Sequence, residues 1–136
     1  MIHHSLTKDS GSVSWGAIRR YHTLNLGWDD IGYHFGVELV GEFYEILIGR
    51  SLQKLGAHCY QEGMNRKAIG ICLVGNYDNE PPYEGQLVRT VELVEGLLEQ
   101  FKIPIDNIVA HRDYAPYKSC PGDEFSMIEF KKRLNK

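Results

Sequence analysis

The chain has 136 residues, a formal net charge of −3, and ordinary hydrophobic (43%) and charged (24%) fractions. This length and composition predict one globular domain over residues 1–136 with a single core. No basic tail or Lys/Arg run is present, which argues against nucleic acid as the main partner, and no apolar run is long enough for a transmembrane helix. We therefore expect no nucleic-acid partner and no membrane partner. We also expect a monomer.

The ends and the cysteines bear on the cellular compartment. Residues 1–5 lack the charged and apolar regions of a signal peptide, so we expect synthesis in the cytoplasm with no export signal in this chain. The three cysteines include no CxxC pair, and their odd number predicts free thiols in a reducing compartment. Cys72 lies in an apolar run and is expected in the core, whereas Cys120 alone lies in a setting that suggests chemistry.

Hydrophobic periodicity and turn residues predict a mixed order of helices and strands. In chain order, the expected elements are a strand ending at His3-His4, a helix over 15–22 capped by Ser14, strands over 33–39 and 43–48 joined as a hairpin, a strand over 68–74, a helix ended by Pro104, a strand over 105–110 and a last helix after Ser126. This order predicts an α/β fold in which helices flank a central mixed β-sheet.

Two of the helices carry specific signals. Ser126 with Glu129 forms a possible capping box at the start of the last helix. The longest helix has apolar residues in steps of three and four, which predict a buried stripe made of Leu87, Val91, Val94, Leu98 and Phe101.

The stretch 111–122 carries the strongest chemical signal. It reads His-Arg-Asp-Tyr-Ala-Pro-Tyr-Lys-Ser-Cys-Pro-Gly and brings His111, Lys118 and Cys120 into one loop. Imidazole nitrogen and thiolate sulfur are ligands that zinc prefers. The positive charge of Lys118 would favour the thiolate. A metal site needs at least one further ligand, and we expect it from the other end of the chain.

The candidates at that end are His3 and His4. Adjacent residues on a strand point to opposite faces, so only one of the two can face a given site. The same alternation applies to Tyr33 and His34. Spacing alone does not choose within either pair.

Five segments of the chain carry a resemblance to a known family. They are His3-His4-Ser5-Leu6-Thr7, Gly27 to Phe35, Gly56-Ala57-His58, Ile69 to Asn76, and 111–122. In this order they resemble the zinc-dependent N-acetylmuramoyl-L-alanine amidases, which include T7-type phage lysozyme and the peptidoglycan recognition proteins. Each segment alone is a weak motif, but five in register cover nearly the whole chain. A cysteine at the third ligand position is typical of the T7-type subset.

The resemblance implies a site and a reaction. It implies that His3, His111 and Cys120 hold one zinc ion per chain, and that Tyr33 and Lys118 are catalytic. Three protein ligands leave a fourth position open, as in catalytic zinc sites. The ion would activate water and polarise a carbonyl, Lys118 would stabilise the developing oxyanion, and Tyr33 would position water or relay a proton.

The implied substrate is peptidoglycan or a muropeptide. The bond cleaved would join N-acetylmuramic acid to L-alanine, in an endolysin-like action on the cell wall after release, or on muropeptides. The resemblance places His58, Arg50 and Asn65 at the substrate groove. Some relatives carry a glutamate base where this chain has Cys72, so no carboxylate base is assigned.

A second hypothesis comes from a different functional class. The same fold can serve as a non-catalytic module that binds peptidoglycan or muropeptide without hydrolysis. Such recognition proteins often lack the cysteine ligand, whereas this chain has all three predicted ligands and both predicted catalytic residues. The enzyme is therefore favoured over the binding module.

Overall fold

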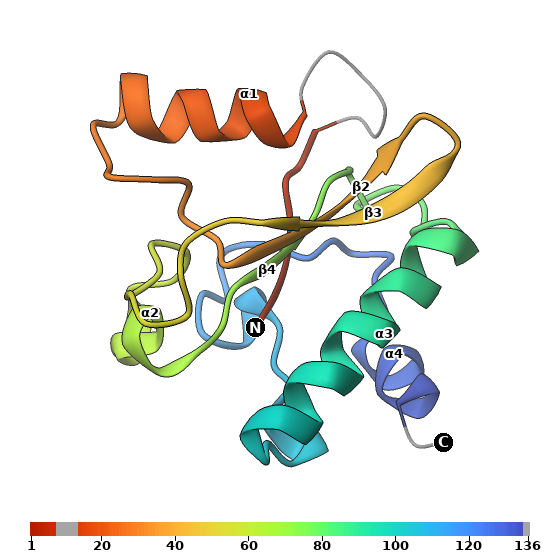
Figure 1. Cartoon of the computed structure of the whole chain (residues 1–136). Coiled ribbons are helices and arrows are strands. Elements are labelled where there is room, and N and C mark those ends of the chain that lie inside the picture. Colours follow the sequence, from red (N-terminus) through yellow and green to blue (C-terminus); the bar gives the residue numbers. More distant parts are fainter. Residues whose placement is uncertain (8–13, 135–136) are drawn as a thin grey trace.

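The computed structural model describes residues 1–7 and 14–134, and its centre is one four-stranded sheet (Figure 1). The strand order is β1-β4-β2-β3, where the strands are β1 (Ile2–His4), β2 (Phe35–Val40), β3 (Phe43–Ile48) and β4 (Ile71–Leu73). β1 and β2 each pair with β4 in parallel, and β2 and β3 form an antiparallel hairpin. The sheet is mixed, as the sequence predicts.

The helices lie on both faces of this sheet. They are α1 (Trp15–Arg20), α2 (Met64–Lys67), α3 (Glu84–Phe101) and α4 (Met127–Arg133). α1 covers one face, and α3 and α4 lie together on the other (Figure 1). Within the described residues, no helix combines the length and the apolar character needed to cross a membrane.

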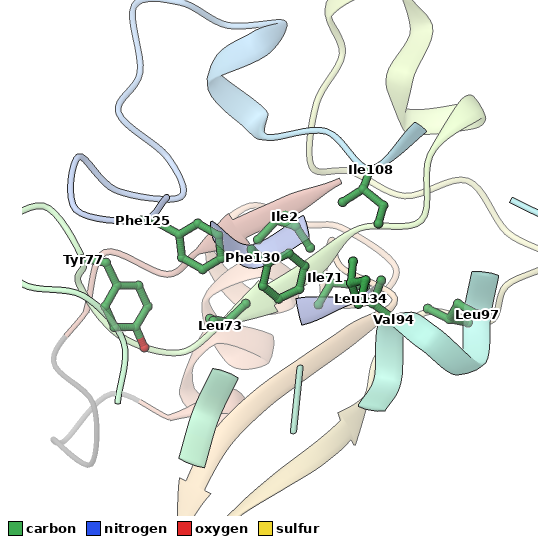
Figure 2. Packing of buried hydrophobic residues seen from close by; sticks show 10 residues of the cluster. All are labelled: Ile2, Ile71, Leu73, Tyr77, Val94, Leu97, Ile108, Phe125, Phe130 and Leu134. Atoms are coloured by element: carbon green, nitrogen blue, oxygen red, sulfur yellow. The ribbon is translucent and has the colours of Figure 1, made fainter. Parts of the chain in front are cut away.

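The side chains of β4 alternate between two cores. Ile71 and Leu73 pack with α3 and α4 in the larger core, which Figure 2 shows from close by. Cys72 and Val74 point to the other face and pack with Trp15 of α1. Both faces of β4 are therefore buried, which is why its sequence is apolar without alternation. The expected burial of Cys72 is confirmed, because the residue has no exposed surface.

The buried face of α3 differs from the predicted stripe. Val94 is buried as expected, but Phe101 is 44% exposed. Two polar residues outside the predicted stripe, Gln86 and Thr90, are fully buried, and Leu97 is buried as well. The reason is a hydrogen-bonded amide, since Gln86 Nε2 donates to the carbonyls of β2 and of the chain after β4, and its Oε1 accepts from the Tyr77 hydroxyl. The predicted residues Leu87, Val91 and Leu98 flank this face and are partly buried.

The predicted strand over 105–110 is wrong. Residues Ile105–Asn107 form a 3₁₀ turn. The backbone N–H groups of Asn107 and Ile108 donate to the carbonyls of Pro104 and Ile105, at 2.9 and 3.0 Å, so they do not enter a sheet ladder. A parallel bridge between Ile2 and Ala110 joins the end of this segment to the sheet.

The other predicted elements have corrected bounds. The expected strand over 68–74 is reduced to β4, and the strand over 33–39 begins at Phe35. The helix expected over 15–22 is α-helical to Arg20 and then continues as a π-helical turn, Tyr21–Asn25. The hairpin turn is as predicted, because Gly41 has a φ of 65°, which glycine adopts without strain.

The last helix supplies a test of the larger core. Ser126 caps α4 through its Oγ, which accepts from the Glu129 N–H at 3.2 Å. Phe130 is then buried against the sheet, with 1% of its surface exposed. We expect Phe130→Ala to lower the free energy of unfolding by about 3–5 kcal/mol, because a cavity replaces the ring. Urea denaturation measures this loss. The slope of the unfolding free energy against urea concentration should be the same in the parent and the variant.

The matched control lies in the same helix. Ile128 is 71% exposed, so Ile128→Ala should change the free energy of unfolding by no more than about 0.5 kcal/mol. An equal loss for both variants would contradict the assignment of Phe130 to the core.

Candidate metal centre and active site

The pleat of β1 separates the two N-terminal histidines. His3 is 1% exposed, and its ring centroid lies 5.2 Å from that of Tyr33 and 4.5 Å from that of His111. His4 points to the opposite face, where its Nδ1 accepts from the backbone N–H of Tyr77 at 3.2 Å. The tertiary structure therefore places the His3 side chain with His111.

The second undecided pair divides in the same way. Tyr33 lies beside His3, whereas His34 is buried and bonded to backbone on both sides of its ring. His34 Nδ1 accepts from the Gly70 N–H at 3.0 Å, and its Nε2 donates to the carbonyl of Lys54 at 3.0 Å. Of the two, Tyr33 is the one available to the site.

Backbone and side-chain bonds close the loop 111–122 on itself. The Arg112 N–H donates to the Cys120 carbonyl at 2.9 Å, which brings Cys120 back beside His111. The Arg112 guanidinium adds bonds to the carbonyls of Ser119, Gly122 and Phe125. The sequence assigned Arg112 no role, and its only signal was its position next to a predicted ligand.

This closure brings three metal-ligand atoms together. One ligand atom from each of His3, His111 and Cys120 lies within 4.8 Å of the others. Cys120 Sγ is 3.7 Å from His3 Nδ1, and it also accepts from the backbone N–H of His4 at 3.3 Å. The ligands implied by the family resemblance and the tertiary contacts are thus the same three residues, a group that can hold a metal ion.

The protonation of the group suits a divalent cation. Burial lowers the pKa of His3 well below its usual value, and burial with the nearby Lys118 charge lowers the pKa of His111 to about 4. Both imidazoles are neutral at pH 7, which is their ligand form. Burial raises the pKa of Cys120 to about 11, against the opposing effects of the His4 N–H and Lys118. The thiol therefore needs a bound cation to become a thiolate.

Two hollows meet at this group. One has a volume of ≈ 450 Å³ and the other ≈ 430 Å³. Four residues line both of them: Tyr33, His111, Tyr117 and Lys118. Among the residues that the structure describes, neither hollow has an aspartate or glutamate in its lining. Together the two hollows form a groove that runs along the metal-ligand atoms. No carboxylate among the described residues lines it, so none of them is a candidate base.

Tyr33 and Lys118 border the group with different chemistry. Burial, and then the neighbouring Cys72 and Cys120, raise the pKa of Tyr33 well above its usual value, so the phenol keeps its proton at neutral pH. Lys118 is exposed, with its Nζ 6.0 Å from the centroid of the Tyr117 ring. The site therefore pairs a protonated hydroxyl with a positive charge on a long side chain.

The three residues predicted at the substrate groove are placed differently from one another. His58 and Asn65 line the larger hollow, but Arg50 lines neither. The Arg50 guanidinium donates to the carbonyls of Asp30, Ile31 and Leu55, so it braces the surrounding loops. Nothing in its geometry supports the predicted substrate contact.

Other residues of the groove had no role assigned from the sequence. His22 lines the larger hollow and packs on Trp28 with ring centroids 4.7 Å apart. Tyr60 and Tyr117 line the same hollow and are 76% and 71% exposed. Trp28 carried a signal, because it lies within one of the five resembling segments.

Comparison with known proteins places this site in a family. Residues 1–123 match the model of the N-acetylmuramoyl-L-alanine amidases, Amidase_2. The chain belongs to this family. The predicted fold and the predicted amidase activity are thereby confirmed at the level of the family.

Relatives of this amidase include phage endolysins. It is 33% identical to the endolysin of Escherichia phage T7 over 126 residues, which covers 89% of the amidase and 78% of the endolysin. Its structure resembles the N-acetylmuramoyl-L-alanine amidase LysC from Clostridium intestinale, with 29% identity, a TM-score of 0.83, and 98% and 82% of the two chains covered. It also resembles a mutant of Drosophila PGRP-LB in complex with tracheal cytotoxin, with 28% identity, a TM-score of 0.75, and 91% and 74% covered.

Proposed function

We propose that this amidase binds one zinc ion through His3, His111 and Cys120 and hydrolyses the amide between N-acetylmuramic acid and L-alanine in peptidoglycan. The observation that carries the proposal is the meeting of three ligand atoms within 4.8 Å, at the junction of two hollows. Two imidazoles and one thiolate fit zinc, and three ligands leave room for substrate.

The reaction would divide between the ion and two side chains. When bound, zinc supplies a Lewis acid beside the scissile carbonyl. Lys118 then places its ammonium group where negative charge develops on the carbonyl oxygen. Tyr33 is protonated at rest, so its hydroxyl donates a hydrogen bond and can relay a proton, passing its own to the leaving amine and taking one from the attacking water. The thiol of Cys72 does not replace the missing carboxylate, because burial raises its pKa well above the usual value.

The substrate would lie along the groove. Trp28, Tyr60 and Tyr117 supply aromatic faces in the larger hollow, which suit the apolar faces of sugar rings and peptide side chains. The likeness to PGRP-LB bound to tracheal cytotoxin supports a muropeptide-type ligand, and the phage endolysins support action on the cell wall. We propose that residues 1–136 act as one monomeric catalytic domain.

The deciding experiment is a digest of purified peptidoglycan. We expect new L-alanine amino termini to appear and no new reducing sugar ends, because the amide and not a glycosidic bond is cleaved. A chelator should stop the release while circular dichroism shows a largely unchanged fold, and added zinc should restore it. The fold should persist because the larger core is built by the sheet, α3 and α4 and includes none of the three ligands.

The opposite result would support the binding module. If the protein bound muropeptide with measurable affinity but released no L-alanine amine with zinc present, the catalytic proposal would fail. Undiminished release by protein verified to be metal-free would leave hydrolysis in place but contradict the role of zinc.

A further inference from the structure

The ring of His58 is closely packed by its neighbours, and its backbone is fixed by hydrogen bonds. A Cβ atom added at Gly56 would lie 2.5 Å from His58 Cδ2, and one added at Gly70 would lie 2.6 Å from the same atom. The two glycine backbones therefore pack closely against the ring at its Cδ2 edge. Asn65 fixes the backbone at this point, because its Oδ1 accepts from the N–H groups of His58 and Cys59, both at 2.7 Å.

Both ring nitrogens of His58 have partners inside the protein. Nε2 lies 3.1 Å from the carbonyl oxygen of Ala68, and Nδ1 lies 2.9 Å from Nε2 of His3. With both nitrogens engaged, neither is left to bond a substrate in the groove.

The carbonyl oxygen decides where the protons are. A carbonyl only accepts, so His58 Nε2 must carry the proton and donate it to Ala68. A neutral imidazole has one N–H, so His58 Nδ1 accepts, and His3 must donate to it from Nε2. The remaining nitrogen of His3, Nδ1, then has a free lone pair. That nitrogen is the one 3.7 Å from Cys120 Sγ.

We propose that His58 is a positioning residue, which sets the tautomer and the ring orientation of His3 so that Nδ1 faces the metal. The inference rests on the proposed zinc site. Metal-bound histidines commonly donate their other N–H to a carboxylate, a carbonyl or water. Here a neutral imidazole connects His3 to a backbone carbonyl, which orients the ligand without adding a negative charge beside the ion.

Three variants separate positioning from packing. His58→Leu removes the acceptor for His3 and puts an apolar side chain of similar bulk in its place. His58→Asn keeps a side-chain oxygen near the place of Nδ1, so it can still accept from His3. His34→Leu is the matched control, because His34 is a second buried histidine beside Gly70 whose hydrogen bonds go to Gly70 and Lys54 instead of His3.

The first measurement is zinc affinity, by competition with a chromophoric chelator on protein shown to be folded. We expect His58→Leu to weaken zinc binding roughly 10- to 100-fold. His58→Asn and His34→Leu should stay close to the parent. Unchanged affinity in His58→Leu, or equal weakening in His34→Leu, would overturn the proposal.

The second measurement needs neither zinc nor a folded leucine variant. Long-range ¹H–¹⁵N spectra of the parent and of His58→Asn report which ring nitrogen of His3 carries the proton. We expect the Nε2–H tautomer in both. A His3 protonated at Nδ1 in the parent would overturn the positioning role even if zinc binds. Absence of zinc binding by the parent, with the Nε2–H tautomer present, would instead contradict the proposed function alone.

Discussion

The Cys120→Ala protein should lose its zinc and, with it, nearly all amide hydrolysis. Removing the thiolate leaves two neutral imidazoles, which hold a divalent cation much less tightly than the set of three. Loss of the Lewis acid should lower the rate of L-alanine amine release by roughly 10³-fold or more. Elemental analysis measures the zinc content, expected at about one ion per parent chain, and the peptidoglycan digest measures the rate.

A second cysteine provides the control for metal content. Cys59 is buried, but it is not part of the ligand group and its thiol donates to Gln61. Cys59→Ala should retain zinc at the parental level. Full zinc retention in Cys120→Ala, or after changing His3, His111 and Cys120 together, would show that the ion is held elsewhere.

Tyr33→Phe and Lys118→Ala should keep zinc and the fold but lose most of the activity. Tyr33→Phe removes one hydroxyl and preserves the ring that stacks on Trp15, with centroids 6.2 Å apart. The lost group is the one that orders water or moves a proton, so we expect a fall of roughly 100-fold in rate. Lys118→Ala removes a charge that faces the developing oxyanion, which also predicts a fall of roughly 100-fold.

Comparing the loss of muropeptide affinity with the loss of hydrolysis rate separates a catalytic role from a binding role. Muropeptide affinity is a property of the ground state, so it should fall much less than the rate in both variants. Lys54→Ala is the control for loss of a lysine, since Lys54 is exposed and lines neither hollow. Parental rates in Tyr33→Phe and Lys118→Ala would remove these two residues from the mechanism, and a loss confined to affinity would favour a binding module.

Element type was predictable where local rules and burial agree. The hairpin joins two runs of strand-forming residues through Gly41, and the amphipathic helix of 87–101 appears as α3. Prediction failed where tertiary bonds compete with local patterns. Gln86 is polar yet fully buried, because its amide donates to the carbonyl of Val37 in β2, which lies 49 positions away in sequence. The segment after Pro104 has strand-forming residues but satisfies its backbone in a local turn.

Residue types along the chain were enough to predict the chemistry of the site. Imidazole and thiol side chains close together in 111–122 limit the metal to those that prefer nitrogen and sulfur, and the order of helices and strands limits the fold to a sheet with helices on it. Those conclusions depend on residue type and spacing, which the chain carries locally.

Residue spacing left open which side chains meet. The family resemblance implied His3, and the tertiary contacts place it beside His111 and Tyr33. The pleat puts His3 and His4 on opposite faces, and His111 packs on the His3 side whereas the backbone of Tyr77 bonds to His4. The bond between His3 and His58 joins residues 55 positions apart, and the carbonyl that orients His58 belongs to a third segment. In this series of hydrogen bonds, the carbonyl at its end determines which nitrogen of each ring carries the proton. No local pattern in the sequence identifies that carbonyl.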